Sequence, residues 1–285
     1  MELKLLDLFS GIAGFSYAAE KIVKGYKTTQ FVENDSYCQS VIRKNFPDIP
    51  IHDDITTFKA ERGQFDVFTV GFPCQDLSVA GKKKGIGEGT RSGLFYESIR
   101  LLREVRPRFA LFENVRNLLS HENGETFQEV LFQIAKAGYD AEWSVISARD
   151  MGACHLRERI WIVAYTHGKR LERRLPKFQQ ELQEIGQPGQ KDSLCSTNTD
   201  SKRTQSNRTE QATSIWTDAF LNSKERRTLS PDWTGYVSEP CLCRGDDGLR
   251  GRMARLKAMG NSIVPACAAV PLQRIKDLNS SIYND

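Results

Sequence analysis

The chain has 285 residues, with 40 Lys and Arg against 36 Asp and Glu, 39% hydrophobic residues and 27% charged residues. This globular composition suits one large domain, or a large domain with a smaller partner. It contains no run of about 18 apolar residues, which argues against a membrane-spanning helix.

Short apolar runs alternate with amphipathic stretches over the first 165 residues. Strands are predicted at 3–9, 28–33, around Ile51, 65–70, 109–112, 143–147 and 160–164, the last two near the edge of the sheet. Helices are predicted at 15–24, 37–45, 94–105 and 126–137. Because strands that alternate with helices form parallel sheets, the predicted fold class is α/β, with a doubly wound and mainly parallel sheet.

The character of the chain changes after residue 165. Residues 186–213 are rich in Gln, Ser, Thr, Asn and Asp, and are predicted to form an irregular insertion. Residues 166–256 hold 16 Lys and Arg against 12 Asp and Glu, which is the whole positive excess and is compatible with a polyanion-binding surface. A last helix is predicted at 263–278, packing back on the first domain.

The seven cysteines are odd in number and scattered, which argues against a disulfide framework and favours a reducing cytoplasm. Residues 1–11 carry acidic side chains where a signal peptide carries basic ones. Cys241 and Cys243 lack a second cysteine pair at zinc-ligand spacing, so no metal is expected.

Three segments predict a cofactor that contains adenosine. The turn at 10–14 follows a strand and opens a helix, which brings backbone N–H groups close to a ligand, although an ordinary tight turn explains it equally well. Glu33 ends the next strand, where it can accept hydrogen bonds from both hydroxyls of a ribose or stand free on the surface. Asp54 follows a third strand, where it can accept from an adenine amino group or cap a helix.

Residues 71–78 read Gly-Phe-Pro-Cys-Gln-Asp-Leu-Ser and follow a strand. Pro73 forces a turn, which presents Cys74 at the end of the sheet beside the expected cofactor. A thiolate is a strong nucleophile, whereas a lone cysteine is otherwise most often a buried structural residue. The setting favours the nucleophile, because a structural cysteine needs no such turn.

Two further strands carry charged side chains to the same region. Glu113 follows the strand 109–112, where a partly buried carboxyl can stay protonated near neutrality and donate to a ring nitrogen, or can cap a turn. Arg157 and Arg159 open a strand with their side chains on one face. There they can clamp a carbonyl or phosphate oxygen, or form an exposed ion-paired edge.

Five segments, in this order, resemble the motifs of DNA cytosine-5 methyltransferases: 7–15, 71–78, 113–115, 157–159 and 260–265. The resemblance covers residues 1–165 and 255–280. It implies a Rossmann-like, S-adenosylmethionine-dependent methyltransferase that methylates carbon 5 of cytosine in DNA and releases S-adenosylhomocysteine. It also implies a discontinuous catalytic domain at 1–165 and 252–285 and a smaller irregular target-recognition domain at 166–251.

The resemblance also assigns roles to residues. Cys74 becomes the nucleophile, Glu113 holds the N3 edge of a base flipped out of the duplex, and Arg159 contacts the carbonyl oxygen of the base with support from Arg157. The implied cofactor site comprises Phe9, Ser10, Gly11, Ile12, Gly14, Glu33, Asn34, Asp54, Ile55, Pro73, Leu94, Asn261 and Ser262. Residues 80–92 resemble the family's mobile loop, and the expected DNA contacts are Ser78, Lys82, Lys83, Lys84 and Arg91.

The chain departs from the family pattern at His155, where the family usually has glutamine, and in 246–256, where the segment before the closing motif is hard to find. Its recognition region is short, which predicts a small target site. The resemblance implies double-stranded DNA as the partner and a monomeric, cytoplasmic protein of bacterial or phage origin. The resemblance further implies that it acts either beside a cognate restriction endonuclease or as an orphan enzyme of a phage or prophage.

Three alternatives stay open. A methyltransferase of the same fold acting on tRNA shares these motifs, and the appended region 166–251 favours DNA over it. A dinucleotide-dependent oxidoreductase with a redox cysteine gives no role to Glu113 or to 260–262. A DNA-binding protein that has lost catalysis is disfavoured by the intact Cys74 and Glu113.

Overall fold

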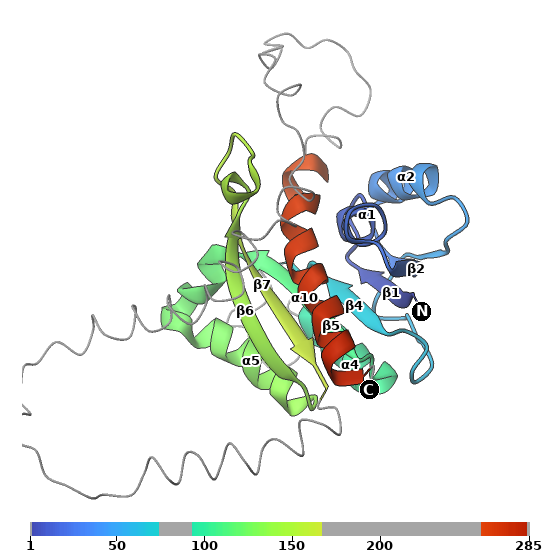
Figure 1. Ribbon diagram of the computed structural model, residues 1–285. Coiled ribbons are helices and arrows are strands. Elements are labelled where there is room, and N and C mark those ends of the chain that lie inside the picture. The colour runs from blue at the N-terminus through green and yellow to red at the C-terminus, as the bar shows by residue number, and fades with distance from the viewer. Residues whose placement is uncertain (1, 74–92, 167–257, 284–285) are drawn as a thin grey trace, which may run out of the picture.

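The structure is a computed structural model that describes residues 2–73, 93–166 and 258–283. Within these ranges, seven strands form one sheet in the order β3-β2-β1-β4-β5-β7-β6 (Figure 1). The strands are β1 (Leu3–Leu8), β2 (Tyr26–Val32), β3 (Ile51–His52), β4 (Val67–Val70), β5 (Phe109–Val115), β6 (Asp140–Ser147) and β7 (Glu158–Tyr165). Strands β1 to β5 are parallel, and β7 runs antiparallel to both β5 and β6. The predicted α/β fold with a mainly parallel sheet is confirmed.

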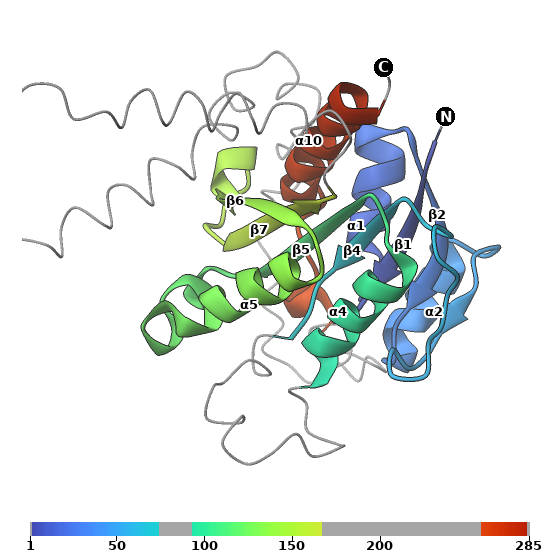
Figure 2. The same cartoon turned by 90° about the horizontal axis from the view of Figure 1, so that it is seen from below.

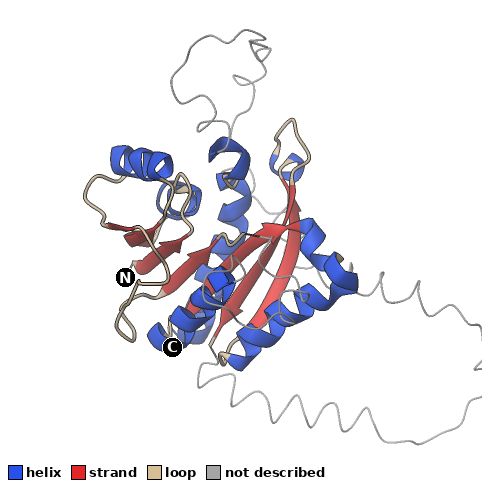
Figure 3. Cartoon of the chain, turned by 180° about the vertical axis from the view of Figure 1, so that it is seen from behind, coloured by secondary structure: helices blue, strands red, loops and turns tan. Residues whose placement is uncertain are grey.

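Helices cover both faces of the sheet. They are α1 (Gly14–Tyr17), which continues as the π-helical η1 (Ala18–Val23), then α2 (Ser36–Asn45), α4 (Gly93–Val105), α5 (Glu125–Lys136) and α10 (Pro265–Tyr283). Short 3₁₀ turns add η3 (Arg116–Leu119), η4 (His121–Gly124) and η5 (Arg149–Met151). The segments α1, η1 and α10 pack on one face, and α4 and α5 pack on the other (Figures 2 and 3).

The two faces of the sheet supply two separate hydrophobic cores because successive side chains of a strand point to opposite faces. In β4, Val67 belongs to the core under α10, whereas Phe68 and Val70 belong to the core under α4 and α5. Both faces are therefore buried, which explains why the central strands read as continuous apolar runs in the sequence. A register shift between Leu5 and Leu6 interrupts the pairing of β1 with β2.

Helix α10 returns from the C-terminal part of the chain to the first domain, as predicted. It begins at Pro265, a residue that suits the first turn of a helix because no intrahelical partner awaits its missing N–H. The Tyr26 hydroxyl donates to the Leu272 carbonyl, and Arg274 Nε lies 2.6 Å from Glu142 Oε1 of β6. These contacts fix the middle of α10 against β2 and β6. Within the described ranges, no helix combines the length and apolarity that crossing a membrane requires.

The predicted recognition domain, 166–251, lies outside the described residues except for Thr166. Its boundaries with the catalytic domain at 1–165 and 252–285 therefore stay predictions.

Candidate active site

The parallel register brings the last residues of β1, β2, β3 and β4 into one row, which Phe112 of β5 joins. Leu8 of β1 pairs with both Val32 of β2 and Val70 of β4, and Val70 pairs in turn with Phe112 of β5. The residue that follows each of these positions therefore lies at the same edge of the sheet. In open α/β sheets, ligands bind at this carboxyl edge.

The turn after β1 has a left-handed backbone at three of five positions. Phe9, Gly11 and Ala13 have φ values of 54°, 54° and 67°. Such φ values are unfavourable for residues other than glycine, and they persist only where surrounding contacts fix the backbone. Ser10 supplies these contacts, because its backbone N–H and its hydroxyl both donate to the Val32 carbonyl and the hydroxyl also donates to the Asp7 carbonyl. Ile12 is half-buried in the same turn.

Glu33 lies directly against this turn. Its Oε2 accepts a hydrogen bond from the Gly11 N–H at 2.7 Å, and its Oε1 accepts from the Asp35 N–H at 2.8 Å. Burial raises the pKa of Glu33, while the two backbone donors lower it. The carboxylate is thus held beside the turn with lone pairs left for further donors, and Asn34 beside it is exposed.

Behind the turn lies a buried carboxyl group that the sequence analysis did not single out. Asp7 of β1 is fully buried, with Oδ2 accepting from the Ser16 hydroxyl at 2.7 Å and Oδ1 from the Thr69 hydroxyl at 2.8 Å. Burial raises its pKa to about 7, against the lowering effect of both hydroxyls. Asp7 ties α1 to β4, the strand that leads to Cys74. The signal was an acidic residue in a strand whose other residues, apart from the exposed Lys4, are leucines.

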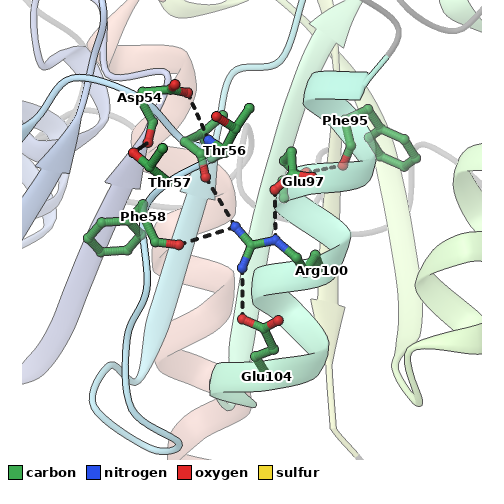
Figure 4. Close-up of polar contacts among 10 residues, drawn as sticks. Asp54, Thr56, Thr57, Phe58, Phe95, Glu97, Arg100 and Glu104 are labelled. Atoms are coloured by element: carbon green, nitrogen blue, oxygen red, sulfur yellow. Dashed lines mark hydrogen bonds and ion pairs between the residues drawn. The ribbon is translucent and has the colours of Figure 1, made fainter. Parts of the chain in front are cut away.

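The turn after β3 holds Asp54 at the same edge. Asp54 is exposed, and its Oδ1 accepts from the Thr56 N–H at 2.8 Å, which lowers its pKa. Arg100 of α4 donates to the carbonyls of Ile55 and Phe58 at 3.1 Å each (Figure 4). The same guanidinium is paired with Glu97 and Glu104. The helix therefore fixes the turn that presents Asp54.

The segment 71–73 continues β4 towards Cys74. Phe72 is buried against Phe95 and Phe112, with ring centroids 5.0 and 6.3 Å away. Asn114, also buried, donates from Nδ2 to the Phe72 carbonyl at 3.0 Å. The described chain ends here at Pro73, which is exposed. Asn114 therefore pins the backbone two residues before Cys74, a role that the sequence analysis did not give it.

Glu113 and Arg159 form an ion pair at the same edge. Glu113 Oε1 lies 3.1 Å from Arg159 Nε, and the side chains are 12% and 22% exposed. Burial raises the pKa of Glu113 to about 7, although the charges of Arg159 and Arg157 lower it. A carboxyl group with this pKa holds a proton near neutrality, which is what donation to a ring nitrogen requires. One expectation is wrong: Glu113 lies within β5, which extends to Val115.

Arg157 and Arg159 have different partners. β7 begins at Glu158, so the prediction that Arg157 lies within the strand is wrong. Arg157 has a φ of 26°, and its guanidinium donates to the carbonyls of Gly260 and Ser262. Only Arg159 is in ion-pair contact with Glu113.

The segment 260–264 lies against the turn after β1. A Cβ placed on Gly14 would lie 2.6 Å from Ile263 Cγ1, so only glycine allows this approach. Ser262 is half-buried and Asn261 is exposed at the same place, and Leu94 is half-buried at the start of α4. The approach of Gly14 to Ile263 thus brings the turn after β1 close to residues 261–262, from the other end of the described chain.

Gly14→Ala is expected to lower the free energy of unfolding by about 1–3 kcal/mol. The new methyl group would overlap Cγ1 of Ile263, an atom too close to the backbone to move aside easily. Ile263→Ala removes the overlapping carbon, so the double variant should lose less stability than the sum of the two single variants. Urea unfolding of the four proteins measures this coupling. Strictly additive losses would show that Gly14 and Ile263 do not meet.

Six predicted residues lie outside the described part of the chain: Cys74, Ser78, Lys82, Lys83, Lys84 and Arg91. Their roles, and the absence of a metal, stay predictions.

Comparison with known proteins gives a consistent result. A family model of C-5 cytosine-specific DNA methylase matches residues 3–248. Type II methyltransferase M.DsaV of Dactylococcopsis salina is 37% identical over 165 residues, which are 58% of this chain and 46% of that protein. Type II methyltransferase M.HhaI of Haemophilus parahaemolyticus is 35% identical over 163 residues, 57% of this chain and 49% of that protein. The chain thus spans about half the length of the curated relatives that it matches.

Among solved structures, a Spodoptera frugiperda DNMT2 mutant aligns over 70% of this chain and 56% of its own, at 18% identity and a TM-score of 0.49.

Proposed function

We propose, from the premise that the chain belongs to the C-5 cytosine-specific DNA methylases, that it transfers a methyl group from S-adenosylmethionine to carbon 5 of a cytosine in a specific double-stranded DNA sequence. The observation that carries the proposal is the partly buried Glu113–Arg159 pair. Glu113 follows Phe112, which pairs with Val70 at the end of the strand that leads to Cys74. A carboxyl group with a pKa raised to about 7 beside a cation suits the polar edge of a pyrimidine.

The residues at the carboxyl edge fit the proposed cofactor. Glu33 retains free lone pairs beside the Gly11 turn, which suits two ribose hydroxyls. A Cβ on Gly11 would meet no atom of the described residues within 4 Å, so these residues leave open space beside the turn. Asp54, Pro73, Leu94 and the 261–262 segment would complete the site. When bound there, S-adenosylmethionine supplies an electrophilic methyl group.

The chain's own groups would activate the base. Carbon 5 of cytosine is a poor nucleophile, and addition of the Cys74 thiolate to carbon 6 moves electron density onto carbon 5. Glu113 stabilises the developing charge by donating its proton at N3, and Arg159 does so by contacting the carbonyl oxygen. After carbon 5 gains the methyl group, its proton passes to solvent, the thiolate of Cys74 is eliminated and the N3 proton returns to Glu113, which restores the aromatic ring and the acid.

The substrate would bind as double-stranded DNA with one cytosine flipped out, since a stacked base cannot reach a thiol and a cofactor together. The basic excess in 166–256, together with Lys82, Lys83, Lys84 and Arg91, suits the phosphate backbone. We further propose a monomer that acts in the cytoplasm, either with a cognate restriction endonuclease or as an orphan methyltransferase of a phage or prophage.

Methylation mapping tests the activity. Genomic DNA from cells that express the chain is expected to gain 5-methylcytosine at one short sequence by bisulfite sequencing, and the purified chain should transfer tritium-labelled methyl groups to the same sequence. Total RNA and tRNA form the second arm of the assay. Methylation of RNA alone would replace the DNA substrate, and no transfer to either nucleic acid would refute the activity.

A further inference from the structure

Arg157 occupies a position that its neighbours hold in an unusual backbone conformation. Its φ of 26° places it outside the range that strands adopt. The carbonyl beside it is fixed, because the Ser147 hydroxyl and the Ala148 N–H both donate to the Leu156 carbonyl at 2.6 and 3.0 Å. The backbone therefore turns the Arg157 side chain away from the path of β7, and a strained residue held in this way is often functional.

The guanidinium of Arg157 donates hydrogen bonds to two backbone carbonyls in the segment 260–262. Nη1 donates to the Gly260 carbonyl at 3.0 Å, and Nη2 donates to the Ser262 carbonyl. These two carbonyls flank Asn261. Because the fork of an arginine carries donors in a fixed plane, it can hold both carbonyls in one arrangement, which a lysine cannot.

The same arginine lies near the base-binding pair. Its charge lowers the pKa of Glu113, and burial followed by the charge of Arg159 lowers its own pKa. Among the described residues, its Nε is buried without a hydrogen-bond partner. Burying part of this charged guanidinium costs free energy. The hydrogen bonds of Arg157, and not a charge exposed to solvent, therefore explain its position.

The 260–262 segment has contacts with the residues before it and with the turn after β1. The Ser262 N–H donates to the Ala258 carbonyl and its hydroxyl to the Met259 carbonyl, both at 2.9 Å. Ile263 closes against Gly14 of the turn after β1. The two hydrogen bonds of the Arg157 guanidinium join this segment to the loop before β7.

We propose that Arg157 is a positioning residue that shapes the cofactor site: it holds the 260–262 backbone and so couples that site to the Glu113–Arg159 pair, without contacting the base itself. This proposal rests on the cofactor binding proposed above. It separates the two arginines, with Arg159 serving the base and Arg157 serving the cofactor.

Calorimetric titration with S-adenosylhomocysteine tests this separation. Arg157→Ala is expected to weaken binding by about 10-fold or more, since two hydrogen bonds from a charged donor are lost, and Arg157→Lys should give an intermediate loss. Arg159→Ala is the matched control, because it removes the same charge two residues further along the chain, within β7. Its affinity should stay within about 2-fold of the wild type.

Turnover gives the complementary readout. At saturating S-adenosylmethionine, Arg157→Ala should regain most of the wild-type kcat, whereas Arg159→Ala should show a lower kcat with an unchanged cofactor KM. Unchanged S-adenosylhomocysteine affinity in a folded Arg157→Ala protein would overturn the proposal. So would a kcat loss that saturating cofactor does not relieve.

If Arg157→Ala does not fold, hydrogen–deuterium exchange of Arg157→Lys provides a second test. Peptides that cover 258–264 should exchange faster in Arg157→Lys than in the wild type, with no cofactor present. Unchanged exchange in these peptides, together with unchanged affinity, would overturn the proposal. If the wild type itself does not bind S-adenosylhomocysteine, the proposed function fails, whereas faster exchange in Arg157→Lys would still establish the link between the two segments.

Discussion

Replacing Cys74 with alanine is expected to lower the rate of methyl transfer by at least about 10⁴-fold while the affinity for S-adenosylhomocysteine stays within about 2-fold. Without the thiolate, nothing adds to carbon 6, and carbon 5 remains too poor a nucleophile to accept the methyl group. The described residues of the cofactor site keep their contacts, because the Phe72 carbonyl and the Asn114 amide do not depend on the sulfur.

Three cysteines lie in the described part of the chain: Cys38 and Cys267 are buried, and Cys154 is exposed. Burial raises the pKa of Cys267 to about 12, so its thiol stays protonated at neutral pH. Cys154 is exposed and supplies the matched control, because Cys154→Ala makes the same chemical change away from the strand-end row. Its turnover should remain within about 2-fold of the wild type.

Covalent trapping reports on the Cys74 step directly. DNA with 5-fluorocytosine at the target position should form an adduct with the wild type and with Cys154→Ala that survives denaturing electrophoresis, because fluorine cannot leave as the proton does. Cys74→Ala should form none. An adduct with Cys74→Ala, or turnover at the wild-type rate, would remove Cys74 from the mechanism.

The sequence predicted the architecture because its signals are local. Alternating apolar runs and amphipathic stretches are spaced as a parallel sheet requires. In the structure, Glu33 directly follows β2, and Asp54 comes two residues after β3. The register of Leu8, Val32 and Val70 then brings the segments that follow these strands to one edge.

What the sequence did not predict depends on contacts between distant residues. Asp7 meets Thr69, and Arg157 meets Gly260, across 62 and 103 positions, and no short pattern encodes such pairs. The placement of Arg157 on the same strand face as Arg159 assumed regular strand geometry. A φ of 26° breaks that geometry just before β7 begins.

Glu113→Gln is expected to slow methyl transfer by about 10²–10⁴-fold at pH 6.5. Glutamine keeps the size of the side chain and a donor for N3, but it cannot deliver a proton. The pKa of Glu113 is raised from 4.5 to about 7, so below pH 7 most of the wild type carries the protonated carboxyl. Above pH 7 the protonated fraction falls about tenfold per pH unit, and with it the part of the rate that depends on Glu113.

Single-turnover rates between pH 5.5 and 9 separate this effect from the ionisation of Cys74, which acts in the opposite direction and is common to both proteins. The ratio of wild-type to Glu113→Gln rates should be constant below pH 7 and should shrink above it. Arg159 lowers the pKa of Glu113, so Arg159→Ala should move the onset of this decline to higher pH, whatever it does to the rate itself. A rate ratio that stays constant up to pH 9 would mean that Glu113 holds the base as a hydrogen-bonding group and not as an acid.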